Sequence, residues 1–195
     1  MKIVLASKSK VRKDILTEHN IDCEVIQSNV DEDPIKNSLI AEGATPEIIS
    51  KNLAELKANK VSSNVYDKLV LGAVIDLNGE LISKPSSREE AMNILRKLNG
   101  KSHYLISSVC ISKNNSMIWN HTDKAKLTMK NFSEVELKDY LNKITDEALY
   151  AYNVYQIEGE GKNLFEKIEG DKDTIMGLPI TQIKTYMENY KWKNF

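Results

Sequence analysis

Hydrophobic and polar residues alternate along the chain in blocks that predict strands and helices in turn. Residues 2–6 are a mostly apolar run of strand length, and residues 10–19 place apolar side chains at helical spacing. Residues 21–26 have the length and composition of a second short strand. The chain is therefore expected to begin with a strand, a helix and another strand.

A polar stretch separates this beginning from a longer helix. Residues 29–44 contain an acidic cluster together with Pro34 and Gly43, a composition typical of a loop. Thr45 and Pro46 follow, and these residue types favour the N-cap and the first position of a helix. The apolar residues after Pro46 keep helical spacing, so a helix is expected there.

The middle of the chain predicts a buried strand that turns back on itself. Residues 68–82 are mostly apolar on both sides of Asn78-Gly79, which is a favoured two-residue hairpin turn. Ser87-x-x-Glu90 then has the spacing of a capping box, and Asn99-Gly100 is a typical helix end. An amphipathic helix is expected between these two signals.

The second half predicts a long hairpin followed by shorter elements. Residues 103–112 and 116–129 are two extended runs that meet at Asn114-Asn115. A second capping box, Ser133-x-x-Glu136, precedes another helix. The remaining expectations are an extended segment at 150–157, a turn at 159–161, a short amphipathic segment at 164–168 and a helix that ends near Tyr190. This mixture predicts an α/β or α+β fold with a sheet that curves around a cleft.

Composition limits the class and the surroundings of the protein. The 195 residues are 41% hydrophobic and 28% charged, which fits one soluble globular unit or two lobes that share a core. The net charge of −1 comes from interspersed signs, which argues against a general nucleic-acid-binding protein. No apolar stretch is long enough to cross a membrane, and no leader pattern is recognisable. We therefore expect a cytoplasmic protein without a nucleic-acid or membrane partner.

Cysteine and histidine spacing does not predict a metal site. Cys23 and Cys110 lie far apart in the sequence and do not form a CxxC pair, so buried free thiols are the simpler expectation. His19, His103 and His121 are also widely separated, and none lies in a metal-ligand motif. We interpret all three histidines as structural.

The turn after the first strand has the chemistry of an anion site. Ser7, Ser9 and Arg12 follow the strand directly, so hydroxyl groups, a guanidinium and the N–H groups of a helix start meet at one point. A phosphate is the ligand that this combination favours. A serine-capped helix with a basic outer face has the same sequence pattern and is more common.

Further motifs, in a fixed order, strengthen the phosphate interpretation. They are Leu5-Ala6-Ser7-Lys8-Ser9-Lys10-Val11-Arg12, Asp31-Glu32, Leu53-Ala54-Glu55-Leu56-Lys57-Ala58, Gly79-Glu80-Leu81-Ile82-Ser83-Lys84-Pro85, Gly100 to His103, Glu158-Gly159-Glu160-Gly161, Phe165, Ile168-Glu169-Gly170 and Gly177-Leu178-Pro179. In this order and over nearly the whole chain, they resemble the Maf family of nucleotide pyrophosphatases.

The resemblance implies a fold and an activity. It implies an α/β protein in which a curved mixed sheet and flanking helices form two lobes around a cleft, as in inosine-triphosphate pyrophosphatases. Residues 1–195 would then be a single domain. Members of the family are often dimeric, so a homodimer is expected. Such enzymes hydrolyse a nucleoside triphosphate between its α and β phosphates with a divalent metal such as magnesium, manganese or cobalt. The small-molecule partner is therefore expected to be a nucleotide.

The resemblance also assigns roles to particular residues. The groups that would bind phosphate are Ser7, Ser9, Arg12, Lys57 and Lys84. Arg12, Lys57 and Lys84 would also be catalytic, because phosphoryl transfer needs cations around the phosphates. Glu32 would be the metal ligand. Without the resemblance, Lys57 and Lys84 would be interpreted as solvated surface lysines.

Two positions bear on the choice of base. Glu158 stands where the pyrimidine branch of the family has Gln, and Val11 stands where that branch has Arg. A carboxylate suits guanine, whose N1–H and N2 amino group are paired donors. The resemblance is therefore to the branch that acts on 7-methyl-GTP, including its alphaproteobacterial members. The alternative is that Glu158 is simply an exposed loop carboxylate.

The chain departs from the family at the catalytic aspartate. Val74 occupies the corresponding place, although the strand also looks about two residues shorter than in the family. Asp76 would share the strand face of Val74 at a distance of roughly 6–7 Å along the strand. Either the cleft lacks a carboxylate at 74, so that Val74→Asp would raise turnover, or the strand has slipped and Asp76 is catalytic. A weakened nucleotide-binding protein with a regulatory role, for example in septation, is the alternative function.

Overall fold

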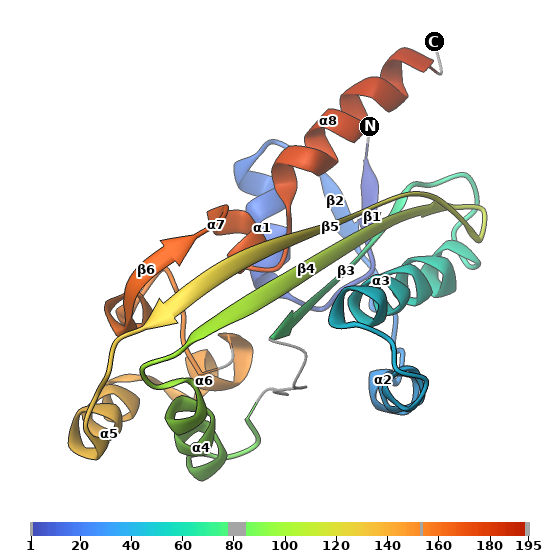
Figure 1. Ribbon diagram of the computed structural model, residues 1–195. Coiled ribbons are helices and arrows are strands. Elements are labelled where there is room, and N and C mark those ends of the chain that lie inside the picture. The colour runs from blue at the N-terminus through green and yellow to red at the C-terminus, as the bar shows by residue number, and fades with distance from the viewer. Residues whose placement is uncertain (1, 78–84, 153, 194–195) are drawn as a thin grey trace. The chain divides into compact units, whose positions relative to one another are not determined.

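The computed structural model describes residues 2–77, 85–152 and 154–193. In it, β-strands form a six-stranded sheet with the order β2-β1-β3-β4-β5-β6. The strands are β1 (Ile3–Leu5), β2 (Cys23–Val25), β3 (Val70–Leu77), β4 (Ser102–Lys113), β5 (Ser116–Met129) and β6 (Phe165–Glu169). Both β2 and β3 pair with β1 in parallel, whereas β6 pairs with β5 in antiparallel orientation. The sheet is therefore mixed, as the α/β prediction requires (Figure 1).

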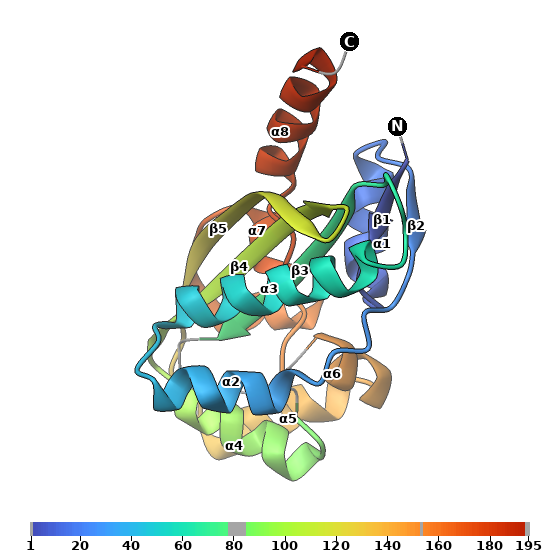
Figure 2. The ribbon, with the colours of Figure 1, turned by 90° about the vertical axis from the view of Figure 1, so that its right-hand side faces the viewer.

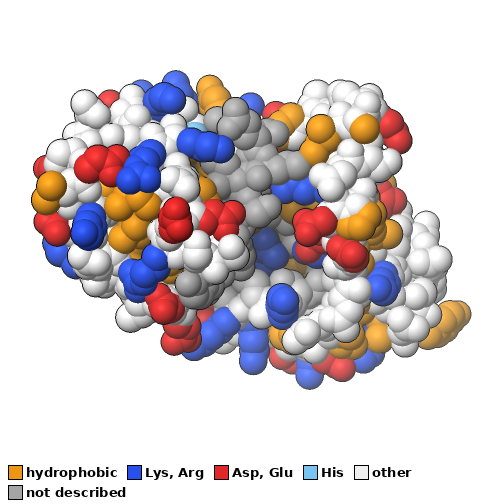
Figure 3. All heavy atoms as spheres, turned by 90° about the horizontal axis from the view of Figure 1, so that it is seen from below, with side chains coloured by type: hydrophobic (Ala, Val, Ile, Leu, Met, Phe, Trp, Pro, Cys, Tyr) orange, Lys and Arg blue, Asp and Glu red, His pale blue; other side chains and the backbone are white. Residues whose placement is uncertain are grey.

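Helices alternate with these strands along the chain. They are α1 (Lys10–Glu18), α2 (Glu32–Ala41), α3 (Pro46–Ser62), α4 (Arg88–Leu98), α5 (Glu134–Lys143), α6 (Asp146–Tyr152), the 3-10 helix η1 (Glu160–Leu164), α7 (Lys172–Ile175) and α8 (Ile180–Lys193). None of the helices in the described ranges combines the length and the apolar character that a membrane span requires. Side chains of both charge signs are interspersed on the face that Figure 3 shows.

The chain divides into two compact units. Unit 1 comprises Met1–Asp76, Ile106–Lys124 and Asp171–Phe195, and unit 2 comprises Leu77–Leu105 and Ala125–Gly170. The chain passes between the units at the end of β3, within the long strands β4 and β5, and after β6.

Strand alternation gives unit 1 an apolar cluster on each face of its sheet. Ile3 and Leu5 on β1 pack in one cluster with the buried residues of α1 and α8. Val4, between them, points to the opposite face and packs with α3. Successive strand side chains point to opposite faces, so β1 is covered on both sides. This double coverage explains why residues 3–6 are continuously apolar rather than alternating.

The packing of α3 against β3 requires a glycine. A Cβ atom on Gly72 would come within 2.8 Å of the Ala58 backbone nitrogen and would overlap the Ala54 carbonyl oxygen. Ala54 and Ala58 are themselves fully buried small residues on α3. The small side chains allow the backbones of the helix and the strand to approach closely.

The predicted N-cap of α3 is confirmed, since Thr45 accepts a hydrogen bond from the Ile48 N–H.

The predicted loop at 29–44 is wrong over most of its length, because α2 occupies its centre. Pro34 is in the first turn of α2, where its missing N–H has no intrahelical partner to lose. Acidic residues in the same turn complement the positive end of the helix dipole. Pro34 and the acidic cluster were therefore helix-start signals. Figure 2 shows α2 running alongside α3, with which it makes contacts.

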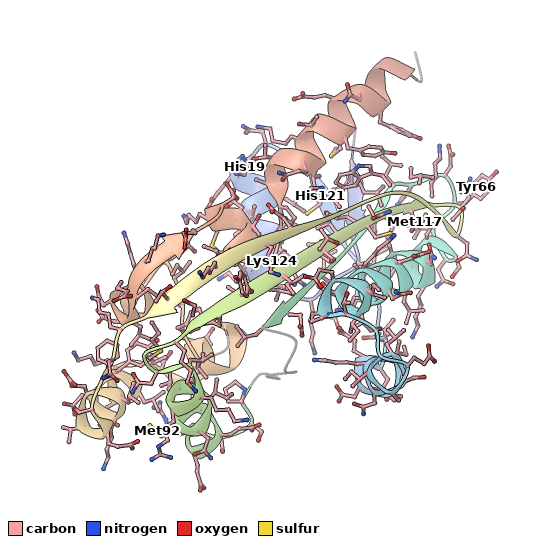
Figure 4. The ribbon with its side chains drawn as sticks, in the orientation of Figure 1. His19, Tyr66, Met92, Met117, His121 and Lys124 are labelled. Carbon is pink, nitrogen blue, oxygen red and sulfur yellow. The ribbon has the colours of Figure 1, made fainter. Side chains whose placement is uncertain are left out.

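The long hairpin is confirmed, and a special turn closes it. Asn114 and Asn115 have φ angles of 50° and 60° between β4 and β5. Asparagine tolerates this left-handed region better than most residues, which suits a two-residue hairpin turn. Met117, His121 and Lys124 follow one another along β5 (Figure 4).

In unit 2, α4 and α5 pack on each other and begin at the predicted caps. Ser133 and Glu136 form a complete capping box. Ser87 also caps α4, but the carboxylate of Glu90 bonds to the N–H and hydroxyl of Ser86 instead of closing the box. A bidentate ion pair between Arg96 and Glu134 joins the two helices at 2.8 Å.

The expectation of an extended segment at 150–157 is wrong at its start. Residues 150–152 are the last part of α6, and no strand is assigned to the described residues between α6 and η1. Thr145 supplies the missing signal, because its hydroxyl oxygen accepts a hydrogen bond from the Ala148 N–H. Asp146 and Glu147 then provide the acidic first turn. This N-terminal pattern outweighs the extended composition that follows it.

A polar contact lies inside the apolar interior of unit 2. His103 is completely buried, and its Nε2 atom lies 2.6 Å from the Tyr155 hydroxyl oxygen. Both rings contact the ring of Phe165. Within the described residues, the His103 Nδ1 atom has no hydrogen-bond partner. Burial lowers the pKa of His103 to about 4.

This burial predicts a pH-dependent stability. The unfolded chain takes up a proton near the ordinary histidine pKa of 6.5, whereas folded His103 does so near 4, so stability falls as the pH decreases through this window. We expect the free energy of unfolding to drop by about 2 kcal/mol between pH 7 and pH 5. Urea titrations at both pH values should show this drop in the unsubstituted protein and in a His121→Gln control. The drop should be smaller in His103→Gln. An equal drop in all three proteins would contradict the assignment.

Candidate active site

The turn between β1 and α1 brings backbone and hydroxyl groups to one point in unit 1. Ser9 is the N-cap of α1, and its hydroxyl oxygen accepts a hydrogen bond from the Arg12 N–H. The Ser9 N–H in turn donates to the hydroxyl oxygen of Ser7 at 3.2 Å. Ser7 is buried directly after the strand. This is the strand–turn–helix arrangement that the sequence predicts for an anion site.

Arg12 ties this turn to a distant segment of the chain. Its Nε–H donates to the Gly177 carbonyl oxygen at 3.0 Å, and one terminal nitrogen donates to Ser7 at 3.2 Å. The side chain is buried, with only 9% of its surface exposed. Burial lowers the pKa of the guanidinium to about 10, and the charge of Glu32 opposes that shift. Arg12 therefore remains a cation at neutral pH.

Gly177 fits this contact in two ways. Its φ angle is +90°, a conformation that L side chains rarely adopt. A Cβ atom on Gly177 would also lie 3.1 Å from a terminal nitrogen of Arg12. The Gly177-Leu178-Pro179 motif thus places a carbonyl oxygen against the guanidinium without steric conflict.

Lys57 and Glu32 form an ion pair beside this arginine. The Lys57 Nζ atom on α3 lies 2.6 Å from the Glu32 Oε1 atom on α2. The Lys57 side chain is 12% exposed, and burial lowers its pKa, while Glu32 raises it. The charges of Arg12 and Lys8 lower the Lys57 pKa further. Glu32 therefore lies close enough to act electrostatically on both Lys57 and Arg12.

A second ion pair links α2 to the end of β3. The Lys36 Nζ atom lies 3.7 Å from the Asp76 Oδ1 atom, and the two side chains are 16% and 7% exposed. Lys36 follows Glu32 by four residues on α2, so both side chains project from one face of the helix, one turn apart. Through this face, α2 connects Lys57 on α3 with Asp76 on β3.

Val74 and Asp76 differ sharply in their surroundings. Both lie on the β3 face that packs toward α3, as the predicted alternation requires. Val74 is 6% exposed and packs in an apolar cluster that includes Ala54 and Ala58. Asp76 is also buried but contacts Lys36. Val74 is thus a core position and Asp76 a polar one, and the choice between the two alternatives for the catalytic carboxylate stays a prediction.

The remaining predicted residues lie elsewhere in the described structure or outside it. Val11 is partly buried and packs against the apolar cluster of α1 and α8. Glu158 is exposed in unit 2, just before Gly159 and η1. Lys84 lies outside the described residues, as does the predicted turn at Asn78-Gly79. The roles assigned to these residues stay predictions.

The described residues do not form a metal cage by themselves. No three His, Cys, Asp or Glu side chains gather in the described ranges as a metal-binding group. Glu32, the predicted metal ligand, forms its ion pair with Lys57. Magnesium that is bound together with phosphates needs only one or two carboxylates from the protein. Glu32 and Asp76 can meet that smaller requirement.

The fold is that of an α/β protein, and unit 1 contains the charged side chains of Arg12, Lys57, Glu32 and Asp76 in buried or partly buried positions. The family described as Maf-like protein matches residues 2–190, and the chain belongs to this family. The family resemblance inferred from the motifs is thereby confirmed.

Relatives of known name agree with this assignment. A protein of Pelagibacter ubique (strain HTCC1062), named nucleoside triphosphate pyrophosphatase, is 65% identical over 191 residues, covering 97% of this chain and 98% of the relative. A protein of Brucella abortus biovar 1 (strain 9-941), named 7-methyl-GTP pyrophosphatase, is 35% identical over 193 residues, covering 98% of this chain and 97% of the relative. The structure of the Staphylococcus aureus Ham1 protein has a TM-score of 0.42 and 18% identity, covering 69% of this chain and 73% of that chain. The TM-score of this structural match is too low to support a conclusion.

Sequence reasoning missed Lys36 and the carbonyl of Gly177. The interpretation of residues 29–44 as a loop concealed Lys36. The sequence did contain a signal for a helix here. Ile35 and Leu39 are spaced as an apolar helix face, and Glu32 and Lys36 are spaced as a charged pair. The Arg12–Gly177 contact joins residues that are 165 positions apart, and no local pattern predicts it.

The fixed geometry of Arg12 leads to a stability prediction. A lysine at this position keeps the charge but has one nitrogen, whereas arginine contacts the Gly177 carbonyl and Ser7 from two separate nitrogens of its rigid guanidinium. We expect Arg12→Lys to lower the free energy of unfolding by about 1–3 kcal/mol, measured by urea titration. The matched control is Lys13→Met on the exposed side of α1, which should change it by less than about 0.5 kcal/mol. Equal effects of the two substitutions would contradict the bridging role of Arg12.

Proposed function

We propose that this protein is a nucleoside triphosphate pyrophosphatase, which hydrolyses a nucleotide to its monophosphate and pyrophosphate. The observation that carries the proposal is a set of charged side chains around the turn after β1 and at the end of β3, in which Arg12 and Asp76 are buried and Lys57 and Glu32 are partly buried. Buried cations close to a helix N-terminus are the groups that a triphosphate needs. The names of the Pelagibacter ubique and Brucella abortus relatives support the same activity.

The chain's own groups suggest how the phosphates are held. The Ser7 oxygen already accepts two hydrogen bonds, so its proton is suited to donate to a phosphate oxygen. Arg12 and Lys57 would offset the negative charge that develops on the leaving pyrophosphate. Lys84 is proposed as a third cation and Ser9 as a further hydroxyl contact, on the resemblance alone.

Asp76 is the group we propose as the catalytic carboxylate. Hydrolysis needs a water molecule to attack the α phosphorus while the bond to the bridging oxygen breaks, and the attacking water must lose a proton. A carboxylate within reach of that water can accept the proton. Asp76 is the acidic residue of β3, and the Lys36 Nζ atom lies 3.7 Å from its Oδ1 atom.

A divalent cation such as magnesium, manganese or cobalt is part of the proposal. When bound, it would neutralise phosphate charge and polarise a phosphoryl oxygen. Glu32 is the carboxylate we propose for holding it, with Asp76 as a second oxygen ligand if both are needed. Exchange of Glu32 from Lys57 to a cation would be required, since Lys57 occupies its Oε1 atom at 2.6 Å.

The proposed substrate is a modified guanine nucleotide such as 7-methyl-GTP. Glu158 is the candidate for guanine recognition, because a carboxylate accepts both hydrogen bonds from the paired N–H donors of that base. Val11 is proposed as a second residue for base recognition, on the resemblance alone. The name of the Brucella abortus relative supports this choice of substrate. A single domain over residues 1–195, a homodimer and a cytoplasmic location complete the proposal.

One observation keeps a weakened nucleotide-binding protein as a second candidate. Val74 lies in an apolar cluster at the place where the family pattern carries aspartate. If Asp76 does not replace that group, nucleotide would bind without efficient turnover. A pyrophosphate-release assay over a panel of nucleotides with magnesium, run beside calorimetric binding, distinguishes the two functions. Turnover supports the enzyme, and binding without turnover supports the second candidate.

Substitutions on β3 test which position carries the carboxylate. We expect Asp76→Asn to lower the rate of pyrophosphate release about 10²–10⁴-fold at saturating metal, because a catalytic acid or base typically contributes that much. Val74→Asp would place a carboxylate among apolar side chains, so we expect it to destabilise the fold and not to raise turnover. A folded Val74→Asp protein with much faster release, beside an unaffected Asp76→Asn protein, would show that position 74 is the functional one.

Glu158 can be tested through base preference. An amide presents one acceptor and one donor, so Glu158→Gln should mismatch one of guanine's donors. We expect kcat/KM for 7-methyl-GTP relative to UTP to fall about 10-fold or more. Glu160→Gln, two residues further along, is the matched control and should leave the ratio unchanged. The same ratio in both variants and in the unsubstituted protein would count against Glu158.

A further inference from the structure

Helix α2 is held to unit 1 by few apolar contacts and by charges. None of its residues is buried, and the side chain of Asp31, its N-cap, makes no capping hydrogen bond. Ile35 and Leu39 are partly buried against the α3 cluster. The ion pairs of Glu32 and Lys36 supply the polar connections of this face to α3 and β3. The position of α2 therefore depends on charges that a ligand can alter.

Lys36 is an unusual residue on such an exposed helix. Its side chain is only 16% exposed, so its ammonium group has lost much of its hydration. The Lys36 Nζ atom lies 3.7 Å from the Asp76 Oδ1 atom. This distance exceeds the range of about 2.7–3.2 Å for an N–H···O hydrogen bond. The contact is thus electrostatic and loose. A poorly hydrated ammonium with a loose partner gains more from a phosphate oxygen than a solvated lysine does.

Glu32 has the position that an anionic ligand would take. Its carboxylate contacts Lys57 and acts electrostatically on Arg12, the two buried cations of the site. A phosphate that binds these cations competes with Glu32 directly. Lys36 lies one helical turn from Glu32, on the same side of α2, so a polyphosphate bound at Lys57 needs to extend by about one helical turn to reach Lys36.

We propose that Lys36 is a further phosphate-binding residue. When the nucleotide binds, the Lys36 side chain exchanges its contact with Asp76 for a contact with the polyphosphate. This inference rests on the proposed function and extends it. The exchange releases the Asp76 carboxylate from its lysine at the moment the substrate arrives. Lys36 and Asp76 then act in opposite directions on the affinity for a polyphosphate, because Asp76 competes with the ligand for the same ammonium group.

The alternative is that Lys36 only holds α2 in place. In that case, the loss of either partner of the Lys36–Asp76 pair loosens the same helix, so both substitutions change affinity in the same direction. Opposite signs therefore distinguish a binding role from a structural one.

The test uses inorganic tripolyphosphate without divalent metal, measured by isothermal titration calorimetry at fixed ionic strength. We expect Lys36→Met to raise the Kd at least about 10-fold, the loss expected for one charge-assisted hydrogen bond. Asp76→Asn should lower the Kd, and that gain should largely disappear when Lys36→Met is also present. The matched control is Lys68→Met, which removes a lysine from an exposed ion pair with Glu24 in the same unit and should leave the Kd unchanged.

Each other outcome has a defined meaning. A Lys36→Met protein with the Kd of Lys68→Met contradicts the role of Lys36 and leaves the proposed function intact. A higher Kd in both Lys36→Met and Asp76→Asn indicates a structural role and also overturns the inference. Absence of tripolyphosphate binding in the folded, unsubstituted protein would contradict the phosphate site itself, and with it both proposals.

Discussion

The burial of one guanidinium group organises the site of this protein. Arg12 donates to Ser7 at the end of β1 and to the Gly177 carbonyl at a point 165 residues further along the chain. A buried cation is costly unless polar groups surround it, so both segments are constrained to stay beside it. The turn after β1, the start of α1 and the approach to α8 are thereby fixed together. Lys57 and Glu32 add a second charged pair to the same neighbourhood.

Local patterns predicted those parts of the fold that local physics determines. The Thr45 cap, the Ser133 capping box and the Asn114-Asn115 turn are short-range signals, and all three are confirmed. The failures at 29–44 and 150–157 have a common cause, because the residues that start a helix were not recognised as such in either place. The fold class followed from the mixture of elements, whereas the division into two units depends on contacts between distant residues, which a single sequence does not reveal.

The candidate site was predictable to a different extent. The family resemblance pointed to Arg12, Lys57 and Glu32, and the structure brings these residues together in unit 1. The resemblance could not point to Lys36, because the contact of Lys36 with Asp76 depends on how α2 packs. The uncertainty about the β3 carboxylate had the same origin, since only the packing of neighbouring side chains distinguishes a core position from a polar one.

The contact between Gly72 and α3 has a consequence for how this strand can vary. Because the missing side chain lets Ala54 and Ala58 approach the strand backbone, the strand is anchored to the helix at that residue. An insertion or deletion before Gly72 would disturb the anchor and the core around it. One after Gly72 leaves the anchor intact and moves only the end of the strand. A length change beyond Gly72 would thus keep the packing of the strand on α3 while it shifts Asp76 along the strand, so this strand end can vary without a change of architecture.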